Sequence, residues 1–132
     1  MKGYVTSIEK DTRKNSDFRR VLYTGNNSQL VLMSLKPMEE IGMEVHKNVD
    51  QFFRFEQGEG KVVIDGVEHN IKDGDAVIVP AGAWHNVVNT SKKIELKLYT
   101  IYSPPEHKDK VIRHTKSDAE ASPEEYDGKP TE

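Results

Sequence analysis

The chain has 132 residues and a mass of 15.0 kDa, a size that fits one domain with its own hydrophobic core. Its 19 Lys and Arg and 22 Asp and Glu side chains give a net charge of −3, and the absence of a basic cluster argues against a nucleic-acid partner. There is no cysteine, which excludes disulfides, thiolate metal ligands and a cysteine nucleophile. The apolar runs are too short for a membrane span and none resembles a signal peptide, so we expect a cytoplasmic protein with no membrane partner.

Seven short runs in the middle of the chain have the composition of β-strands. Asp65-Gly66 between two of them indicates a hairpin, because a type I′ turn needs positive φ at both central residues. Short strands with turns at this spacing predict an all-β, antiparallel sandwich or barrel. The expected strands cover residues 29–35, 51–55, 61–64, 67–71, 76–79, 84–88 and 94–101.

The end of the chain differs in composition from the rest. From Ser117 onward almost no apolar residue remains, and Ser122-Pro123 and Gly128-Lys129-Pro130 disfavour regular structure. We therefore expect one domain over residues 1–116 and a mostly irregular, mobile polar tail over residues 117–132. We expect a helix only within residues 103–120, with residues 116–120 as the best candidate.

The sharpest local signal is a set of fixed spacings in the second half of the chain. The pattern Gly74-x5-Pro80-x-Gly82-x2-His85-x3-Asn89 predicts a tight reversal at Pro80 and Gly82 between two strands. Alternation along the second of these strands puts His85 on the same face as Asn89.

A second polar group lies upstream of this pattern. Glu44 and His46 are two residues apart, so on a strand both side chains point the same way. The next strand begins at Gln51, which shares a face with Phe53 and Phe55.

These two stretches resemble the two conserved motifs of the cupin superfamily, over residues 42–60 and 74–89. The second motif is matched at every fixed position, and the resemblance extends over about residues 30–102. It implies a small single-domain cupin, folded as an antiparallel jelly-roll β-barrel. In that family, a His-x-His and a Glu of the first motif and a His of the second hold a divalent metal ion inside the barrel.

The chain departs from the family pattern at two of the four ligand positions. Glu44 stands where the first His is expected and Gln51 where the Glu is expected, whereas His46 and His85 occupy the other two positions. The resemblance therefore implies the ligand set Glu44, His46, Gln51 and His85, in which one carboxylate is kept but moved. Two imidazoles and a carboxylate suit one divalent ion per chain, which would be Mn, Fe, Ni, Co or Zn.

Two alternatives to this ligand set stay open. Asp50 rivals Gln51, because it lies four residues after His46, although alternation places Asp50 on the face away from Phe53. The other alternative is a cupin that has lost its metal. An unpaired carboxylate inside a barrel is costly, so Glu44 beside two histidines favours a cation there.

The remaining candidates are assigned by location and alternation. We expect His69 beside a turn at the surface, and solvated positions for His107 and His114 rather than a role as a lid over the barrel mouth. Trp84 should point away from the face of His85. The expected wall of a substrate pocket consists of Phe53, Phe55, Val87, Leu96 and Leu98, with Met33 or Met43 as further candidates.

The resemblance and the ligand set favour a metal-dependent enzyme that acts on a small organic molecule by dioxygenation, isomerisation or a related Lewis-acid step. The alternative is a non-catalytic binding module or sensor for a small ligand or metal.

Several strands are apolar on both faces, as between Leu30 and Leu35, so the outer face must meet another layer. Because small cupins are frequently homodimers, we expect a homodimer.

Overall fold

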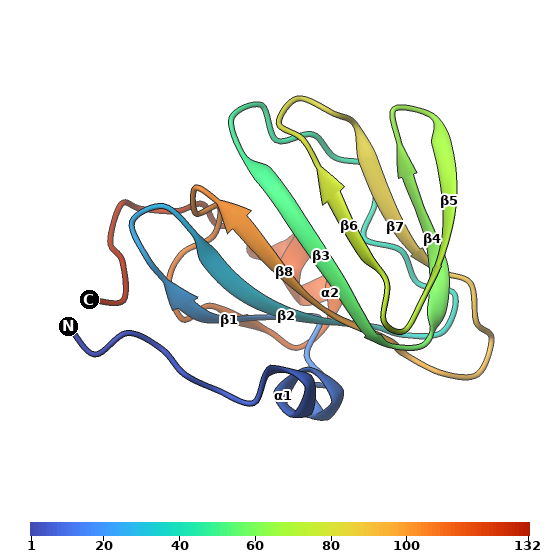
Figure 1. Cartoon of the computed structure of the whole chain (residues 1–132), viewed down its shortest axis with the longest axis horizontal. Helices are drawn as coiled ribbons and strands as arrows, with labels where there is room; N and C mark the ends of the chain where they lie inside the picture. Colours follow the sequence, from blue (N-terminus) through green and yellow to red (C-terminus); the bar gives the residue numbers. More distant parts are fainter.

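The structure, a computed structural model that describes residues 1–132, consists of nine strands and two short helices (Figure 1). The strands are β1 (Arg19–Thr24), β2 (Gln29–Leu35), β3 (Asp50–Gln57), β4 (Glu59–Ile64), β5 (Val67–Lys72), β6 (Ala76–Val79), β7 (His85–Asn89), β8 (Leu96–Ser103) and β9 (Ile112–Arg113). The helices are α1 (Ile8–Lys14) and α2 (Lys116–Ala121). Neither helix is long and apolar enough to cross a membrane. The predicted mostly-β, antiparallel fold is confirmed.

The strands form two antiparallel sheets with the hydrophobic core between them. The larger sheet has the order β6-β3-β8-β2-β1-β9, and the smaller has the order β5-β4-β7. Phe53 and Leu98 of the larger sheet and Val62 and Val87 of the smaller sheet are fully buried members of one core. This arrangement is the jelly roll that the sequence implies.

The hairpin predicted at Asp65-Gly66 is confirmed. Ile64 pairs with Val67 across the turn, and the φ angles of Asp65 and Gly66 are +45° and +81°, as a type I′ turn requires. The N–H of Asp65 donates to the carbonyl of Trp84 at 2.8 Å, and the N–H of Trp84 donates to Asp65 Oδ1 at 2.9 Å. The hairpin therefore anchors the chain just before β7.

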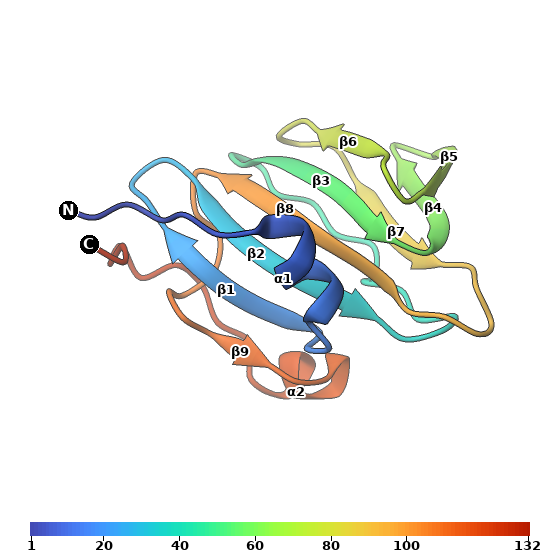
Figure 2. The ribbon, with the colours of Figure 1, turned by 60° about the horizontal axis from the view of Figure 1, so that its bottom comes forward.

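Helix α1 was not expected, because its sequence contains a single apolar side chain and no strong N-terminal cap. A contact with strand β8 of the larger sheet explains why this segment is helical. Lys97 Nζ on β8 donates to the carbonyls of Arg13 at 3.0 Å and Asn15 at 2.8 Å, so it satisfies carbonyls at the C-terminal end of the helix. Lys97 alternates with the buried Leu96 and Leu98, so α1 lies on the outer face of the larger sheet (Figure 2).

The C-terminal residues lie against the domain. Helix α2 covers the residues where the sequence predicts a helix. Beyond it, the N–H of Tyr126 donates to the carbonyl of Glu106 at 3.0 Å, and the N–H of Thr131 donates to the carbonyl of Thr24 at 2.8 Å. The side chain of Glu132 accepts from the N–H groups of residues 2 and 3, so the two termini lie side by side (Figures 1 and 2). Mobility of this tail in solution stays a prediction.

Candidate metal centre

Backbone hydrogen bonds bring the two halves of the site together. Glu44 and His85 form an isolated antiparallel bridge, in which the N–H of each donates to the carbonyl of the other at 2.9 Å. The N–H of Gly82 donates to the carbonyl of His46 at 2.8 Å. Gly82 has a φ of +89°, which favours glycine, and this explains the reversal after Pro80. The turn and the first residue of β7 thus hold the backbone of the upstream segment.

The side chains of Glu44, His46 and His85 converge between the sheets. One ligand atom from each lies within 4.8 Å of the others. Glu44 Oε1 is 3.5 Å from His46 Nε2 and 3.6 Å from His85 Nε2. Both Nε2 atoms are buried and lack a hydrogen-bond partner, whereas buried polar atoms are normally paired. This group could hold a metal ion.

A backbone contact anchors one nitrogen of the His85 ring and turns the other toward the cluster. Its Nδ1 lies 3.0 Å from the carbonyl oxygen of Ala83, which only accepts hydrogen bonds. Nδ1 therefore carries a hydrogen, and Nε2, which faces Glu44 at 3.6 Å, is the nitrogen left for a metal ion. His85 is 1% exposed, so water is kept away from this side of the cluster.

The charges within the cluster depend on one another. Burial acts to lower the pKa of His46, but the Glu106 and Glu44 carboxylates outweigh it and raise that pKa to about 9. Burial acts to raise the pKa of Glu44, whereas His46 and His85 outweigh it and lower that pKa to about 2. In the metal-free protein a proton on His46 therefore balances Glu44, and a metal ion must displace that proton to bind.

The structure separates Gln51 from its rival Asp50. Gln51 is 2% exposed, and its Nε2 donates to Thr100 Oγ1 at 3.0 Å, while its Oε1 is buried without a partner. Asp50 is exposed, and its Oδ1 accepts the N–H of Ala81 at 2.9 Å. Gln51 is therefore the residue with an interior oxygen available, as strand alternation predicts.

The five residues expected to line a pocket are all fully buried in the core: Phe53, Phe55, Val87, Leu96 and Leu98. The Phe53 ring meets the ring of His85 edge-on, with centroids 6.3 Å apart, so it packs directly against the cluster. Of the further candidates, Met33 is buried and Met43 is 55% exposed. Contact of this wall with a substrate stays a prediction. Trp84 is 54% exposed.

The expectation for the other histidines is wrong at one position. His69 and His114 carry exposed side chains, as predicted. His107 is only 8% exposed: its Nε2 lies 3.2 Å from the hydroxyl of Tyr102, and its Nδ1 lies 2.7 Å from Glu124 Oε1. The tail covers His107, and no local pattern in the sequence indicates that cover.

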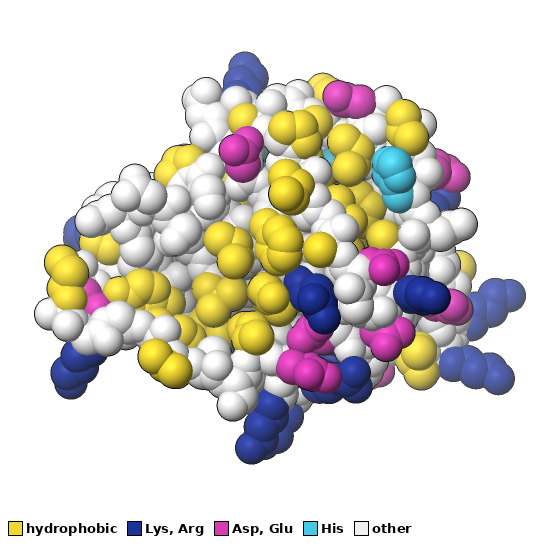
Figure 3. All heavy atoms as spheres, in the orientation of Figure 1, with side chains coloured by type: hydrophobic (Ala, Val, Ile, Leu, Met, Phe, Trp, Pro, Cys, Tyr) yellow, Lys and Arg dark blue, Asp and Glu magenta, His cyan; other side chains and the backbone are white.

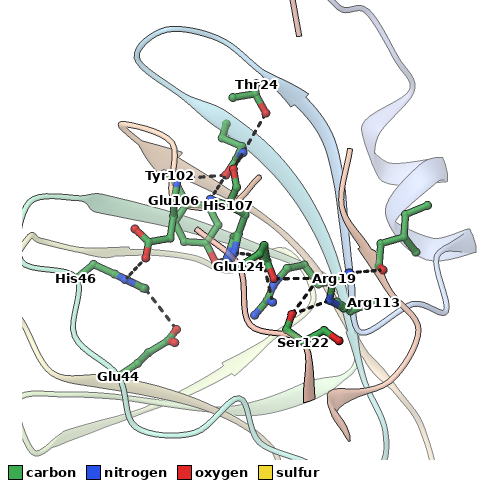
Figure 4. A network of polar contacts seen from close by, with 12 residues as sticks. Arg19, Thr24, Glu44, His46, Tyr102, Glu106, His107, Arg113, Ser122 and Glu124 are labelled. Atoms are coloured by element: carbon green, nitrogen blue, oxygen red, sulfur yellow. Dashed lines mark hydrogen bonds and ion pairs between the residues drawn. The ribbon is translucent and has the colours of Figure 1, made fainter. Parts of the chain in front are cut away.

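Two further residues beside His46 were missed from the sequence, Tyr102 and Glu106 (Figure 4). The Tyr102 ring meets the His46 ring edge-on at 5.8 Å, and burial together with the charge of Glu44 raises the pKa of Tyr102. Tyr102 could have been found, because it alternates with Leu98 and Thr100 on the inner face of β8. Glu106 Oε1 lies 3.3 Å from His46 Nδ1, but Glu106 follows two prolines on an irregular segment where alternation gives no information.

Comparison with known proteins gives a consistent result. Residues 31–102 match the Cupin domain family. The chain is 46% identical over 127 residues to the uncharacterised protein YrkC of Bacillus subtilis, which covers 92% of this chain and 68% of YrkC. It is 44% identical over 108 residues to the uncharacterised protein L612 of Acanthamoeba polyphaga mimivirus, which covers 79% of this chain and 67% of L612.

A solved structure agrees with these relatives. The crystal structure of BH2720 from Bacillus halodurans is similar with a TM-score of 0.89 at 41% identity, over 92% of this chain and 96% of that one. Family match, relatives and jelly-roll architecture therefore lead to one conclusion, that the chain belongs to the cupin family.

Proposed function

We propose that this cupin binds one divalent metal ion per chain through Glu44, His46 and His85, and uses it in a reaction on a small organic molecule. The observation that carries the proposal is a set of three buried polar atoms without hydrogen-bond partners: Nε2 of His46, Nε2 of His85 and Oε1 of Gln51. Once His46 has lost its extra proton, each of these atoms offers a lone pair, and each is costly to bury unpaired. A cation at the cluster would bind both Nε2 atoms, and we propose Gln51 Oε1 as its fourth protein ligand.

The chemistry of these donors narrows the choice of metal. Two imidazole nitrogens, one carboxylate oxygen and one amide oxygen, without any thiolate, suit manganese, iron, cobalt, nickel or zinc. When bound, such an ion would supply Lewis acidity, and in the case of iron or manganese also electron transfer. Gln51 is a neutral and therefore weaker ligand than the Glu of the family pattern.

The exposed fractions of the side chains show which side of the site is open to solvent. The side chains of Glu44 and Glu106 are 34% and 30% exposed, whereas those of His46 and His85 are 11% and 2% exposed. A small molecule would therefore enter on the side of the two carboxylates, and Phe53 would keep water out behind His85. Three or four protein ligands leave coordination positions for substrate, which supports an enzyme.

Elemental analysis of untagged protein from metal-supplemented medium tests the proposal. We expect about one divalent ion per chain, and its loss in His46→Ala and His85→Ala, because imidazoles are the strongest ligands of this set. Chelation should lower the melting temperature, since the ion binds only the folded site. Folded wild-type protein with no metal under these conditions would overturn the proposal.

A second measurement separates an enzyme from a sensor. Each reconstituted metal form is incubated with a panel of small organic molecules, and both product formation and oxygen consumption are followed. Turnover with one metal form, absent in His85→Ala, would support the enzyme. Tight ligand binding without turnover by any metal form would favour the non-catalytic alternative.

A further inference from the structure

Glu106 lies outside both cupin motifs, on the segment that follows β8, yet its side chain reaches the metal centre. Its Oε1 is 3.3 Å from Nδ1 of His46, on the opposite edge of the ring from the Nε2 that faces Glu44 (Figure 4). The sequence separation between Glu106 and His46 is large, so only the fold brings them together.

The backbone at Glu106 is held firmly in place by a buried side chain. Gln29 is 1% exposed, and its Oε1 accepts the N–H of Glu106 at 3.2 Å and the N–H of His107 at 2.9 Å. Gln29 Nε2 donates to the carbonyl of His107 at 2.6 Å. From the other side, the N–H of Tyr126 donates to the carbonyl of Glu106. The carboxylate is therefore presented to His46 by a fixed segment.

The chemistry of the contact decides which nitrogen of His46 can bind a metal. A carboxylate accepts hydrogen bonds, so when a metal ion takes the lone pair of Nε2, Glu106 holds the remaining ring hydrogen on Nδ1. His85 reaches the same form through the Ala83 carbonyl. We propose, on the basis of the metal site proposed above, that Glu106 is a positioning residue that holds His46 for metal binding through Nε2.

The contact also completes the charge of the site. With Gln51 where the family has an acid, Glu44 is the only carboxylate among the four proposed ligands. Glu106 supplies a second negative charge through the ring of His46, which makes that ring a more basic ligand. The two positive charges of the ion are then balanced by Glu44, which binds it directly, and by Glu106, which acts through the ring of His46. The acid missing at position 51 is thus replaced from outside the motif.

Zinc affinity of the full-length protein tests this role. Dissociation constants are measured by competition with a chelator for wild type, Glu106→Ala, Glu106→Gln and the matched control Glu125→Ala, whose side chain is exposed. We expect Glu106→Ala to bind about 10- to 100-fold more weakly. Glu106→Gln keeps an acceptor but loses the charge, so it should fall between Glu106→Ala and wild type. The control should stay within about twofold of wild type.

Nitrogen NMR of the zinc-loaded protein shows which nitrogen of His46 binds zinc and which carries hydrogen. A purely structural role of Glu106 would leave both unchanged. We expect His46 to show zinc on Nε2 and a protected hydrogen on Nδ1, in wild type and Glu106→Gln, and that hydrogen to lose protection in Glu106→Ala. Zinc on Nδ1 of His46, or wild-type affinity in Glu106→Ala, would overturn the inference while leaving the metal site intact.

The same spectroscopy distinguishes this inference from the proposed function. If wild-type protein binds no metal, the proposed function fails. The metal-free protein then still reports on Glu106 through the His46 nitrogen signals of wild type and Glu106→Ala. Signals that differ between the two would support the contact, and identical signals would overturn it.

Discussion

Glu44 and Gln51 are the two positions where this cupin differs from the family pattern, and they should contribute unequally to metal binding. A charged ligand makes a contact about twice as strong as a neutral one, so Glu44→Gln should weaken binding far more than Gln51→Ala. We expect at least about tenfold for Glu44→Gln and a few-fold for Gln51→Ala, from calorimetric titration with zinc and manganese in one buffer. Wild-type affinity in Glu44→Gln together with a loss in Asp50→Asn would move the fourth ligand to Asp50.

The variant Gln51→Glu restores the acid that the family pattern has at this position. Gln51→Glu places a second carboxylate at the ion and should tighten manganese binding more than binding of softer ions. Equal affinity of Gln51→Glu and wild type for manganese would show that Oε1 at this position does not reach the metal.

His46 should make the stability of the metal-free protein depend on pH. Its pKa is raised from 6.5 to about 9 in the folded state, so its contribution is fully present below pH 6.5 and is lost as the pH rises through 9. The loss should be on the order of 2 kcal/mol. Urea unfolding in the presence of a chelator at pH 6, 7.5 and 9 measures it. The difference between wild type and His46→Asn isolates this group, and a constant difference across that range would contradict the prediction.

The resemblance to the cupin motifs implied the proposed ligands, and the structure brings three of them, Glu44, His46 and His85, together. Strand alternation separates Gln51 from Asp50, and the Pro80-x-Gly82 turn fixes where His85 begins a strand. Glu106 could not be predicted, because its position depends on one buried amide, Gln29, that lies 77 residues away in the chain. A hydrogen bond of that range leaves no periodic signal in a single sequence.

Among the elements, the seven central strands and helix α2 were predictable from the sequence, whereas α1, β1 and β9 were not. The central strands are short apolar or alternating runs, and their turns carry glycines at positive φ, such as Gly66 and Gly74. Helix α1 depends on a contact with Lys97 of strand β8. Strand β1 begins with the charged pair Arg19-Arg20, so its sequence does not have the composition typical of a strand. In both cases tertiary contacts outweigh local propensity.

The C-terminal segment is anchored to the domain through Glu124. The Glu124 side chain is one-tenth exposed, and its Oε1 lies 2.7 Å from His107 Nδ1 and 3.8 Å from a nitrogen of Arg19 (Figure 4). Arg113 contributes a third contact at 3.5 Å. Composition alone predicts a mobile polar tail whose removal should cost little stability, but a nearly buried carboxylate with three cationic or hydrogen-bonding partners indicates that the tail is anchored.

We expect Glu124→Ala to lower the free energy of unfolding by on the order of 2 kcal/mol, because it leaves Arg19 and His107 buried without their partner. Glu125→Ala, one residue further along and exposed, should change it by less than about 0.5 kcal/mol. Urea unfolding of both variants, and of a chain ending at residue 121, measures the effect. Equal stability of Glu124→Ala and Glu125→Ala would show that the tail is mobile and contributes little.

At the scale of the whole molecule, the outer face of the larger sheet carries a continuous apolar row. Cross-strand register places Ile78 opposite Phe52, Phe52 opposite Ile101, and Ile101 opposite Leu30. Leu30 in turn lies opposite Tyr23 of β1. Ile78 is 67% exposed, and Figure 3 shows apolar side chains gathered over this part of the sheet. Contiguous apolar surface of this kind often marks an interaction site, so we propose that a second copy of the chain covers it.

Light scattering coupled to size exclusion at micromolar concentration should give a mass of about twice 15.0 kDa for the wild type. Ile78→Lys should shift the protein to the monomer, because a symmetric contact would bring the same charge into the interface from both copies. Since Ile78 is exposed in the single chain, the substitution should leave the melting temperature of the monomer almost unchanged. Ile94→Lys is the matched control, because Ile94 is 47% exposed but lies outside the row, in the loop between β7 and β8. A wild-type mass of one chain would contradict the dimer, and a dimer that survives Ile78→Lys would place the contact on another face.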